Sequence, residues 1–293
     1  MNLFVAELWR FGSRRVVKVM LLVSIALITI VMGIAFSKST VDRATGYSVV
    51  SEDCGSIVTN LEGEPNFESC EEYQTFAEDN RLRLVDLGDV LGGTGPLFVF
   101  VAILLAASCL GAEFGAASLS TQLLFEPRRV RVWTAKAAAI AMGIATITLA
   151  LVGVLIVEYL AVCQIRGITD GTPDTFVVDR ALDVLRLVGA SALGGLFGFA
   201  ITGFARRTVA ALGVFILLFI AEPLIYNSTD LLDGKMPLWS LFAFVNDPFD
   251  QPEFRPADTF GLHSLSQAGL VPALWIAAML LITGWQFHRS EIR

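Results

Sequence analysis

Six blocks of apolar residues, each about as long as a bilayer is thick, limit the folds open to this chain more than any other feature. A transmembrane helix needs about 20 mainly apolar residues, at about 1.5 Å of rise per residue. Because backbone groups in lipid must pair internally, and the alternating pattern of a β-barrel is absent, each block predicts a helix. Hydrophobic residues make up 55% of the chain and charged residues 17%, which predicts an all-α, polytopic membrane protein. The six predicted spans cover residues 16–36, 90–112, 132–160, 184–204, 208–225 and 268–287.

Basic residues near the ends of these spans predict the orientation. An even number of spans places both termini on one side of the membrane. On that side the spans are flanked by twelve basic residues and only four acidic ones, so the positive-inside rule predicts a multi-pass protein of the cell membrane with cytoplasmic N- and C-termini. The net charge of −7 then comes from an acidic outer side, and nothing indicates nucleic-acid binding. The twelve basic residues are Arg10, Arg14, Arg15, Lys18, Arg128, Arg129, Arg131, Lys136, Arg206, Arg207, Arg289 and Arg293.

Residues 1–15 carry the pattern of an amphipathic helix. Leu3, Phe4, Leu8 and Phe11 recur at helical spacing, with charged residues between them. We expect this segment to lie on the inner membrane interface; a frayed terminus is the alternative.

The first connection on the predicted outer side, residues 37–94, is expected to form an acidic loop or small ectodomain. It holds Cys54 and Cys70, whose pairing in an oxidising compartment would close a loop of about 15 residues and stabilise the fold by about 3 kcal/mol. We expect a disulfide, with two free thiols as the alternative.

The last outer connection, residues 226–267, contains two apolar pieces, 236–245 and 260–265, that are too short to cross a bilayer. They predict a re-entrant segment before the last helix. Plain interfacial anchoring through Trp239 and the phenylalanines is the alternative.

Two acidic residues, Glu158 and Glu222, fall inside predicted spans. A carboxylate at the bilayer centre costs at least about 2.5 kcal/mol, so both are candidates for the outer part of a transport pathway. Both lie near the outer ends of their helices, where that cost falls, and residues of the outer mouth without a function are the alternative.

Small residues recur at every fourth position of the fourth span, which predicts a face for close helix packing, within the chain or against a second subunit. They are Ala190, Gly194, Gly198 and Thr202.

Sequence motifs of catalysis are absent. The chain has no phosphate-binding G-x-x-x-x-G-K-[ST] loop, no H-E-x-x-H and no G-x-S-x-G, and the acidic outer loop lacks the spacing of a calcium loop. We therefore expect no catalytic, cofactor or metal site in this chain. If the protein is an active transporter, another chain must hydrolyse the nucleotide.

Residues 113–131, between the second and third spans, are polar and basic but contain a short apolar stretch. Leu119, Leu123 and Leu124 are expected to form one face of a short helix that ends before Pro127. A short helix that projects apolar side chains into the cytoplasm suits a groove on a soluble partner.

This arrangement resembles the membrane subunits of ATP-binding-cassette (ABC) exporters of the type-2 (ABC-2) permease family, in which a helix in this connection precedes a proline, arginines and a lysine. The sequence departs from the family at Gly115-Ala116-Ala117-Ser118, where threonine or serine often follows the glycine, and in its long first outer loop. The residues that carry the resemblance are Glu113, Ala116, Ala117, Leu119, Leu123, Leu124, Pro127, Arg129, Val132, Ala135 and Lys136.

The resemblance implies a permease that pairs with a second copy or a similar permease, in contact with membrane lipids. Cytoplasmic ABC ATPase subunits, which bind ATP and Mg, would dock on the connection. The competing class is a stand-alone sensor or scaffold that displays the acidic ectodomain and needs no ATPase. The cargo stays open between a drug-like amphiphile, a peptide, a lipid and a glycan. The coupling residues that the resemblance implies are Glu113, Phe114, Leu119, Leu123, Leu124, Arg128, Arg129 and Arg131.

Overall fold

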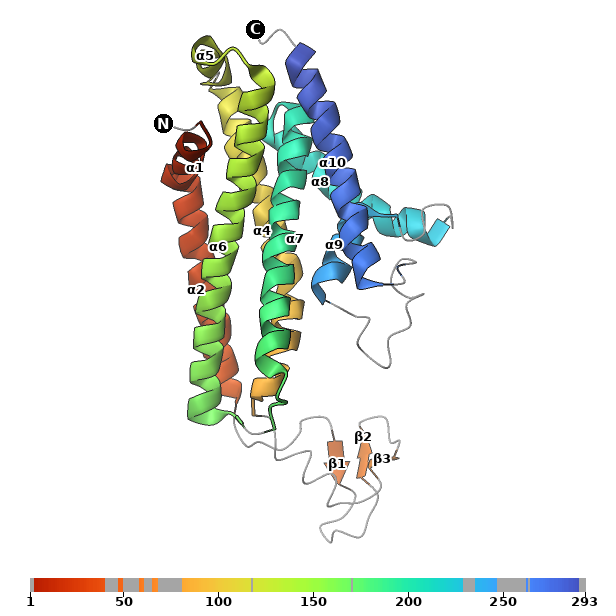
Figure 1. Cartoon of the computed structure of the whole chain (residues 1–293). Helices are drawn as coiled ribbons and strands as arrows, with labels where there is room; N and C mark the ends of the chain where they lie inside the picture. Colours follow the sequence, from red (N-terminus) through yellow and green to blue (C-terminus); the bar gives the residue numbers. More distant parts are fainter. Residues whose placement is uncertain are drawn as a thin grey trace. The chain divides into compact units, whose positions relative to one another are not determined.

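The computed structural model describes residues 3–39, 81–116, 118–169, 171–228, 235–246, 262 and 264–289, and the backbone of three short strands between residues 47 and 67. Within these residues, six helices are long and apolar enough to cross a membrane, which confirms the predicted multi-pass class (Figure 1). They are α2 (Arg15–Lys38), α4 (Leu87–Gly115), α6 (Arg129–Arg166), α7 (Phe176–Ala205), α8 (Thr208–Ser228) and α10 (Leu265–Arg289).

The shorter elements among the described residues are three helices, one 3-10 turn and three strands. The strands form one antiparallel sheet in the order β1-β2-β3, with Val49 opposite Val58 and Val58 opposite Phe67. The all-α prediction did not include this small sheet within residues 37–94. The elements are α1 (Leu3–Ser13), α5 (Ser118–Phe125), α9 (Pro237–Asn246), η1 (Leu84–Asp86), β1 (Tyr47–Val49), β2 (Val58–Asn60) and β3 (Pro65–Phe67).

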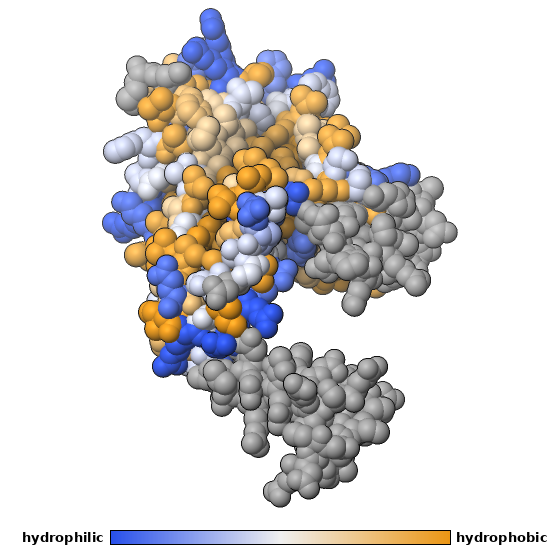
Figure 2. Space-filling view, turned by 60° about the horizontal axis from the view of Figure 1, so that its bottom comes forward, coloured by the Kyte–Doolittle hydropathy of each residue, from blue (hydrophilic) through white to orange (hydrophobic). Residues whose placement is uncertain are grey.

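The long helices expose much of their apolar surface. Leu22, Leu217 and Leu281, on α2, α8 and α10, are each more than half exposed. Figure 2 shows broad apolar areas on the molecular surface. Exposed apolar area of this extent is what lipid, or another apolar surface, covers in a membrane protein.

The chain divides into two compact units. The first contains Met1–Ile25, Gly88–Gly153 and Val177–Arg293, and the second contains Ala26–Leu87 and Val154–Phe176. In the first unit, α1, α5 and the C-terminal end of α10 lie at the same end, which we call the α5 end (Figure 1).

The core of the first unit is centred on Trp133 of α6. Its ring lies 4.4 Å from the ring of Phe199 and 5.3 Å from that of Phe287, measured between centroids. These aromatic pairs connect α6 with α7 and α10, and Phe11 brings α1 into the same buried cluster.

The small-residue stripe of α7 packs against α4 within the chain. A Cβ atom on Gly194 would lie 2.9 Å from the Val99 side chain, and one on Gly198 would lie 2.5 Å from the backbone oxygen of Ile103. Ala190 and Thr202 are also buried. Glycine at these two positions therefore permits the close approach of the two helices.

The second unit joins the ends of α2 and α6 to the segment that leads into α4. The hydroxyl of Tyr159 donates a hydrogen bond of 2.7 Å to the carbonyl of Arg83. The guanidinium of Arg166 lies 4.2 Å above the Phe36 ring. Backbone hydrogen bonds from Ile168 to Leu82 and from Leu84 to Ile168 complete the connection.

Candidate functional site: a buried charge cluster at the α5 end

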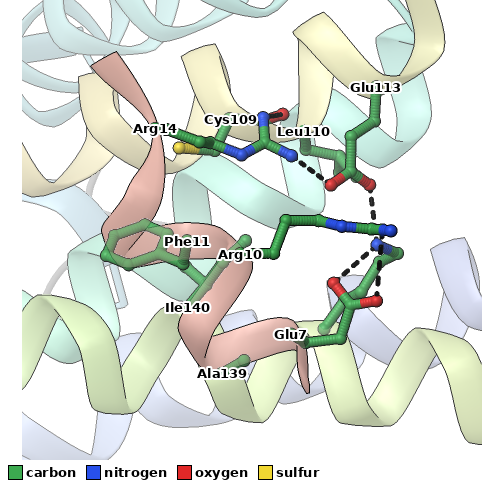
Figure 3. A pocket seen from close by; sticks show the side chains of 10 residues that line it. Glu7, Arg10, Phe11, Arg14, Cys109, Leu110, Glu113, Ala139 and Ile140 are labelled. Atoms are coloured by element: carbon green, nitrogen blue, oxygen red, sulfur yellow. Dashed lines mark hydrogen bonds and ion pairs between the residues drawn. The ribbon is translucent and has the colours of Figure 1, made fainter. Parts of the chain in front are cut away.

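Four charged side chains from four segments meet inside the first unit, at the α5 end. Glu7 comes from α1, Arg14 from the break between α1 and α2, and Glu113 from the last turns of α4 (Figure 3). Lys136 comes from the second turn of α6. We call these four residues the charge cluster.

The ammonium group of Lys136 lies between the two carboxylates of the cluster. Its Nζ atom is 2.8 Å from Oε2 of Glu7 and 2.8 Å from Oε2 of Glu113. The other oxygen of Glu113 pairs with the guanidinium of Arg14, which also donates a 2.6 Å hydrogen bond to the carbonyl of Cys109. The two positive and two negative charges of the cluster thus balance formally, and the half-exposed Arg10 makes a longer contact of 3.5 Å with Glu7.

Burial makes this balance important. The side chains of Lys136, Glu7 and Glu113 are 3%, 7% and 8% exposed, and that of Arg14 is 20% exposed. A buried charge that loses its partner costs about 3–5 kcal/mol, although an intact buried pair adds little net stability. The cluster therefore fixes the position of α1 against α4 and α6 more than it strengthens the fold.

Close packing of α1 supports the same contacts. Phe11 is buried one helical turn after Glu7, and a Cβ atom on Gly143 of α6 would lie 2.5 Å from the Phe11 ring. Glycine at residue 143 lets α1 approach α6 closely enough for Glu7 to reach Lys136.

α5 is hydrogen-bonded to this cluster. The side-chain amide of Gln122 donates to Oε1 of Glu7, and Arg10 donates a 3.3 Å hydrogen bond to the Gln122 carbonyl oxygen. At the start of α5, the Ser118 hydroxyl donates to the backbone oxygen of Glu113 at 3.4 Å. A displacement of α5 would therefore pull on both α1 and α4.

The apolar residues of α5 do not share one exposed face, contrary to the expectation from the sequence. Leu119 is buried in the core of the first unit, and Leu123 packs against the same core. Leu124 and Phe125 are 83% and 86% exposed. In a helix of only eight residues, the apolar positions surround the axis, so contacts with the bundle decide which side chains face inward.

Other residues of the predicted coupling segment also divide between core and surface. Phe114 packs against the hydrophobic core of the first unit. Arg128 is exposed, Arg129 is half-buried, and Arg131 lies 3.8 Å from the carboxylate of Glu126.

A groove of about 500 Å³ runs between α1 and α5. Leu3, Ala6 and Arg10 line it from α1, and Thr121, Gln122 and Phe125 line it from α5. Another protein could bind at this end through the groove and the two exposed apolar side chains of α5.

The two acidic residues predicted for an outer pathway lie in different units and in different surroundings. Glu222 of α8 is buried, and its carboxylate accepts hydrogen bonds of 3.1 Å from the backbone N–H of Leu238 and 3.0 Å from that of Trp239. These are N–H groups of the first turn of α9, so Glu222 caps that helix. Glu158 of α6 accepts a 2.7 Å hydrogen bond from the hydroxyl of Thr29.

The remaining predicted site residues are two cysteines. Cys54 and Cys70 lie outside the described residues, so the predicted disulfide stays a prediction. Cys109 and Cys163 are buried free thiols. In the described part of the chain, no group of three or more His, Cys, Asp and Glu side chains is placed to hold a metal ion.

Glu7 and Arg14 were missed as partners of Glu113 and Lys136. A signal was present, because residues 3, 7, 11 and 14 share one helical face and Leu3 and Phe11 on that face are apolar. A glutamate on an otherwise apolar face indicates a buried partner.

No family model matches this sequence, and no curated protein matches it significantly.

Proposed function

We propose that this chain is the permease subunit of an ATP-driven ABC exporter of the type-2 class. In this proposal two permeases form the substrate pathway, and α5 is the coupling helix on which cytoplasmic ATPase subunits dock. Both termini lie in the cytoplasm of a cell whose plasma membrane holds the complex. This chain itself hydrolyses no ATP; ATP and Mg bind the partner.

The observation that carries the proposal is the way α5 is held. Its inward residues, Leu119 and Leu123, pack in the core, while Gln122 joins it to the charge cluster. Its outward residues, Leu124 and Phe125, are 83% and 86% exposed. A rigid helix with two exposed apolar side chains suits a partner's groove.

The charge cluster can transmit a movement of α5 to α1 and α4. If a closing ATPase pushes α5, the hydrogen bond from Gln122 displaces Glu7, and Lys136 carries that displacement to Glu113 and α4. The buried pairs can exchange partners but cannot simply separate, because separation would leave an uncompensated charge. Such a cluster is suited to switching between two arrangements of the helices.

The exposed apolar surfaces of α2, α8 and α10 are consistent with a second permease at part of the surface and lipid at the rest. In this proposal α9, capped by Glu222, is the re-entrant helix on the outer side.

The test is co-purification from the native membrane in mild detergent, without crosslinking. A stoichiometric ATPase that carries the G-x-x-x-x-G-K-[ST] loop is expected with the unmodified chain. The double variant Leu124→Asp/Phe125→Asp should lose it, while Leu124→Met/Phe125→Leu should keep it. Because both positions are exposed, the thermal midpoint of the permease should stay the same in all variants.

A preparation of the unmodified chain without an ATPase would overturn the proposal in favour of a sensor or scaffold. Retention of the ATPase by the double Asp variant would overturn the assignment of α5 as the docking helix.

A further inference from the structure

The first unit holds a second polar cavity, of about 330 Å³, at the end opposite α5. It lies where α4 and α7 begin and where α9 ends. The charge cluster does not contribute to it, and neither does any residue of the coupling segment. Its polar lining consists of Asp89, Asp179, Arg180, Asp183, Arg186 and Asn246.

Charges of both signs line this cavity. Asp183 lies 3.1 Å from Arg180 and 3.6 Å from Arg186, so one carboxylate serves two guanidinium groups. Both guanidinium side chains are about one quarter exposed, at 25% and 24%. Asp89 and Asp179 add two carboxylates to the same cavity. A ligand with one anionic group and one cationic group complements this lining better than an ion of a single sign.

The depth of Arg186 in the membrane indicates the kind of ligand. α7 ends at Ala205, next to Arg206 and Arg207 at the α5 end. Twenty residues of helix separate Arg186 from Arg206, which is about 30 Å and matches the hydrocarbon thickness of a bilayer. Arg186 therefore lies at the opposite boundary, where lipid phosphates are found. Arginine binds phosphate through paired, charge-assisted hydrogen bonds.

Apolar residues adjoin the charged ones on α7. Leu182 lines the cavity and is 45% exposed, and Leu185, next to Arg186, is 67% exposed. At the depth of the charged residues, these side chains would contact the glycerol ester region that joins a headgroup to its acyl chains.

Glycine on α4 gives Arg180 its place in the cavity. A Cβ atom on Gly88 would overlap the guanidinium of Arg180, whereas a Cβ atom on Gly93 would meet no atom within 4 Å. Gly88→Ala should thus displace the end of one flexible side chain and leave the helix intact. Gly93→Ala is a matched control on the same helix.

We propose that this cavity binds the headgroup of a zwitterionic phospholipid. The phosphate pairs with Arg180 and Arg186, the ammonium group pairs with Asp89 and Asp179, and the glycerol ester region of the lipid lies against Leu182 and Leu185. This site does not depend on the proposed exporter function, because a permease, a sensor or a scaffold could each carry it.

The test is native mass spectrometry of the purified full-length chain in detergent, titrated with dioctanoyl phosphatidylethanolamine. Dioctanoyl phosphatidylglycerol keeps the phosphate but lacks the ammonium group, and it should bind about tenfold more weakly, as expected for the loss of one charged contact. Arg186→Gln and Gly88→Ala should each weaken phosphatidylethanolamine binding about tenfold. Gly93→Ala should not change it.

Equal binding of the two lipids, or unchanged binding in Gly88→Ala, would overturn the proposal. Gly88→Ala keeps the test decisive if Arg186→Gln fails to fold. Soluble glycerophosphoethanolamine has the same headgroup but no acyl chains, so it distinguishes a membrane lipid from a water-soluble ligand. Weak binding of this compound supports a membrane lipid. Binding as tight as that of phosphatidylethanolamine would overturn the lipid proposal in favour of a water-soluble zwitterion.

Discussion

Glu113, at the α5 end, and Glu222, beside α9, are both buried carboxylates of the first unit, at 7% and 4% exposure. Glu113 is surrounded by cations, Lys136 and Arg14, whereas Glu222 is held by two backbone N–H groups at a helix start. The first arrangement depends on a formal charge, and the second depends mainly on an acceptor oxygen. The same residue type therefore serves as part of a balanced ion cluster in one region and as a helix cap in another.

The largest effect should follow loss of the shared cation. In Lys136→Met, Glu7 keeps only the half-exposed Arg10, at 3.5 Å, and Glu113 keeps only Arg14. We expect a loss of about 3–5 kcal/mol in unfolding free energy, measured by denaturant or thermal unfolding in detergent. Lys18→Met, at an exposed position of α2, is the control and should change little. A loss below about 1 kcal/mol for Lys136→Met would show that the cluster is not a closed, buried unit.

The comparison between the two carboxylates is sharpened by making the same substitution at each. Glu113→Gln leaves Arg14 without its carboxylate and should cost about 3 kcal/mol. Glu222→Gln keeps a side-chain oxygen that can accept from Leu238 and Trp239, so its cost should be about 1 kcal/mol or less. Measuring the unfolding free energy of both variants under the same condition shows which substitution costs more. Equal costs, or the reverse order, would mean that Glu222 acts through its charge.

A smaller effect is expected where α5 joins the cluster. Gln122→Ala removes the hydrogen bond to Glu7 without removing a charge, so the stability should fall by about 1 kcal/mol. Hydrogen exchange of the α5 backbone amides should become faster, because the helix loses a tether. Thr121→Ala changes the adjacent exposed residue and serves as the control. Unchanged exchange in Gln122→Ala would indicate that the packing of Leu119 and Leu123 and the Ser118 hydrogen bond are sufficient to hold α5.

Hydropathy located the six long helices because length and apolar composition are local properties. The helical spacing of the leucines, together with Pro127, placed a short helix before that proline, and α5 ends at Phe125. Hydropathy did not place α7 fully: the helix begins at Phe176 rather than at residue 184, because a charged first part scores poorly on hydropathy even where it continues the helix. The polar cavity at this end was consequently not anticipated.

The candidate site was only half visible in the sequence. Glu113, in the connection, and Lys136, at the start of the third span, were among the residues that carry the resemblance, but Glu7 and Arg14 are separated from them by about a hundred residues. Pairings at that separation are set by how the helices pack, which no local pattern encodes. The orientation of Leu119 inward and Leu124 outward depends in the same way on contacts with the bundle.

The smallest effect concerns a third carboxylate, Glu158 in the second unit. Its Oε1 atom accepts from the Thr29 hydroxyl, and its Oε2 atom is buried with no hydrogen-bond partner in the described part of the chain. Since Thr29→Val removes one neutral donor and no cation, the loss should be about 0.5–1 kcal/mol. Thr146→Val on α6, whose hydroxyl donates to the carbonyl of Met142 in its own helix, is the matched control and should be nearly neutral. If Thr29→Val costs as much unfolding free energy as Glu113→Gln, then Glu158 depends on its charge as Glu113 does. In that case Glu158 would not belong with Glu222 as a carboxylate held mainly by hydrogen bonds.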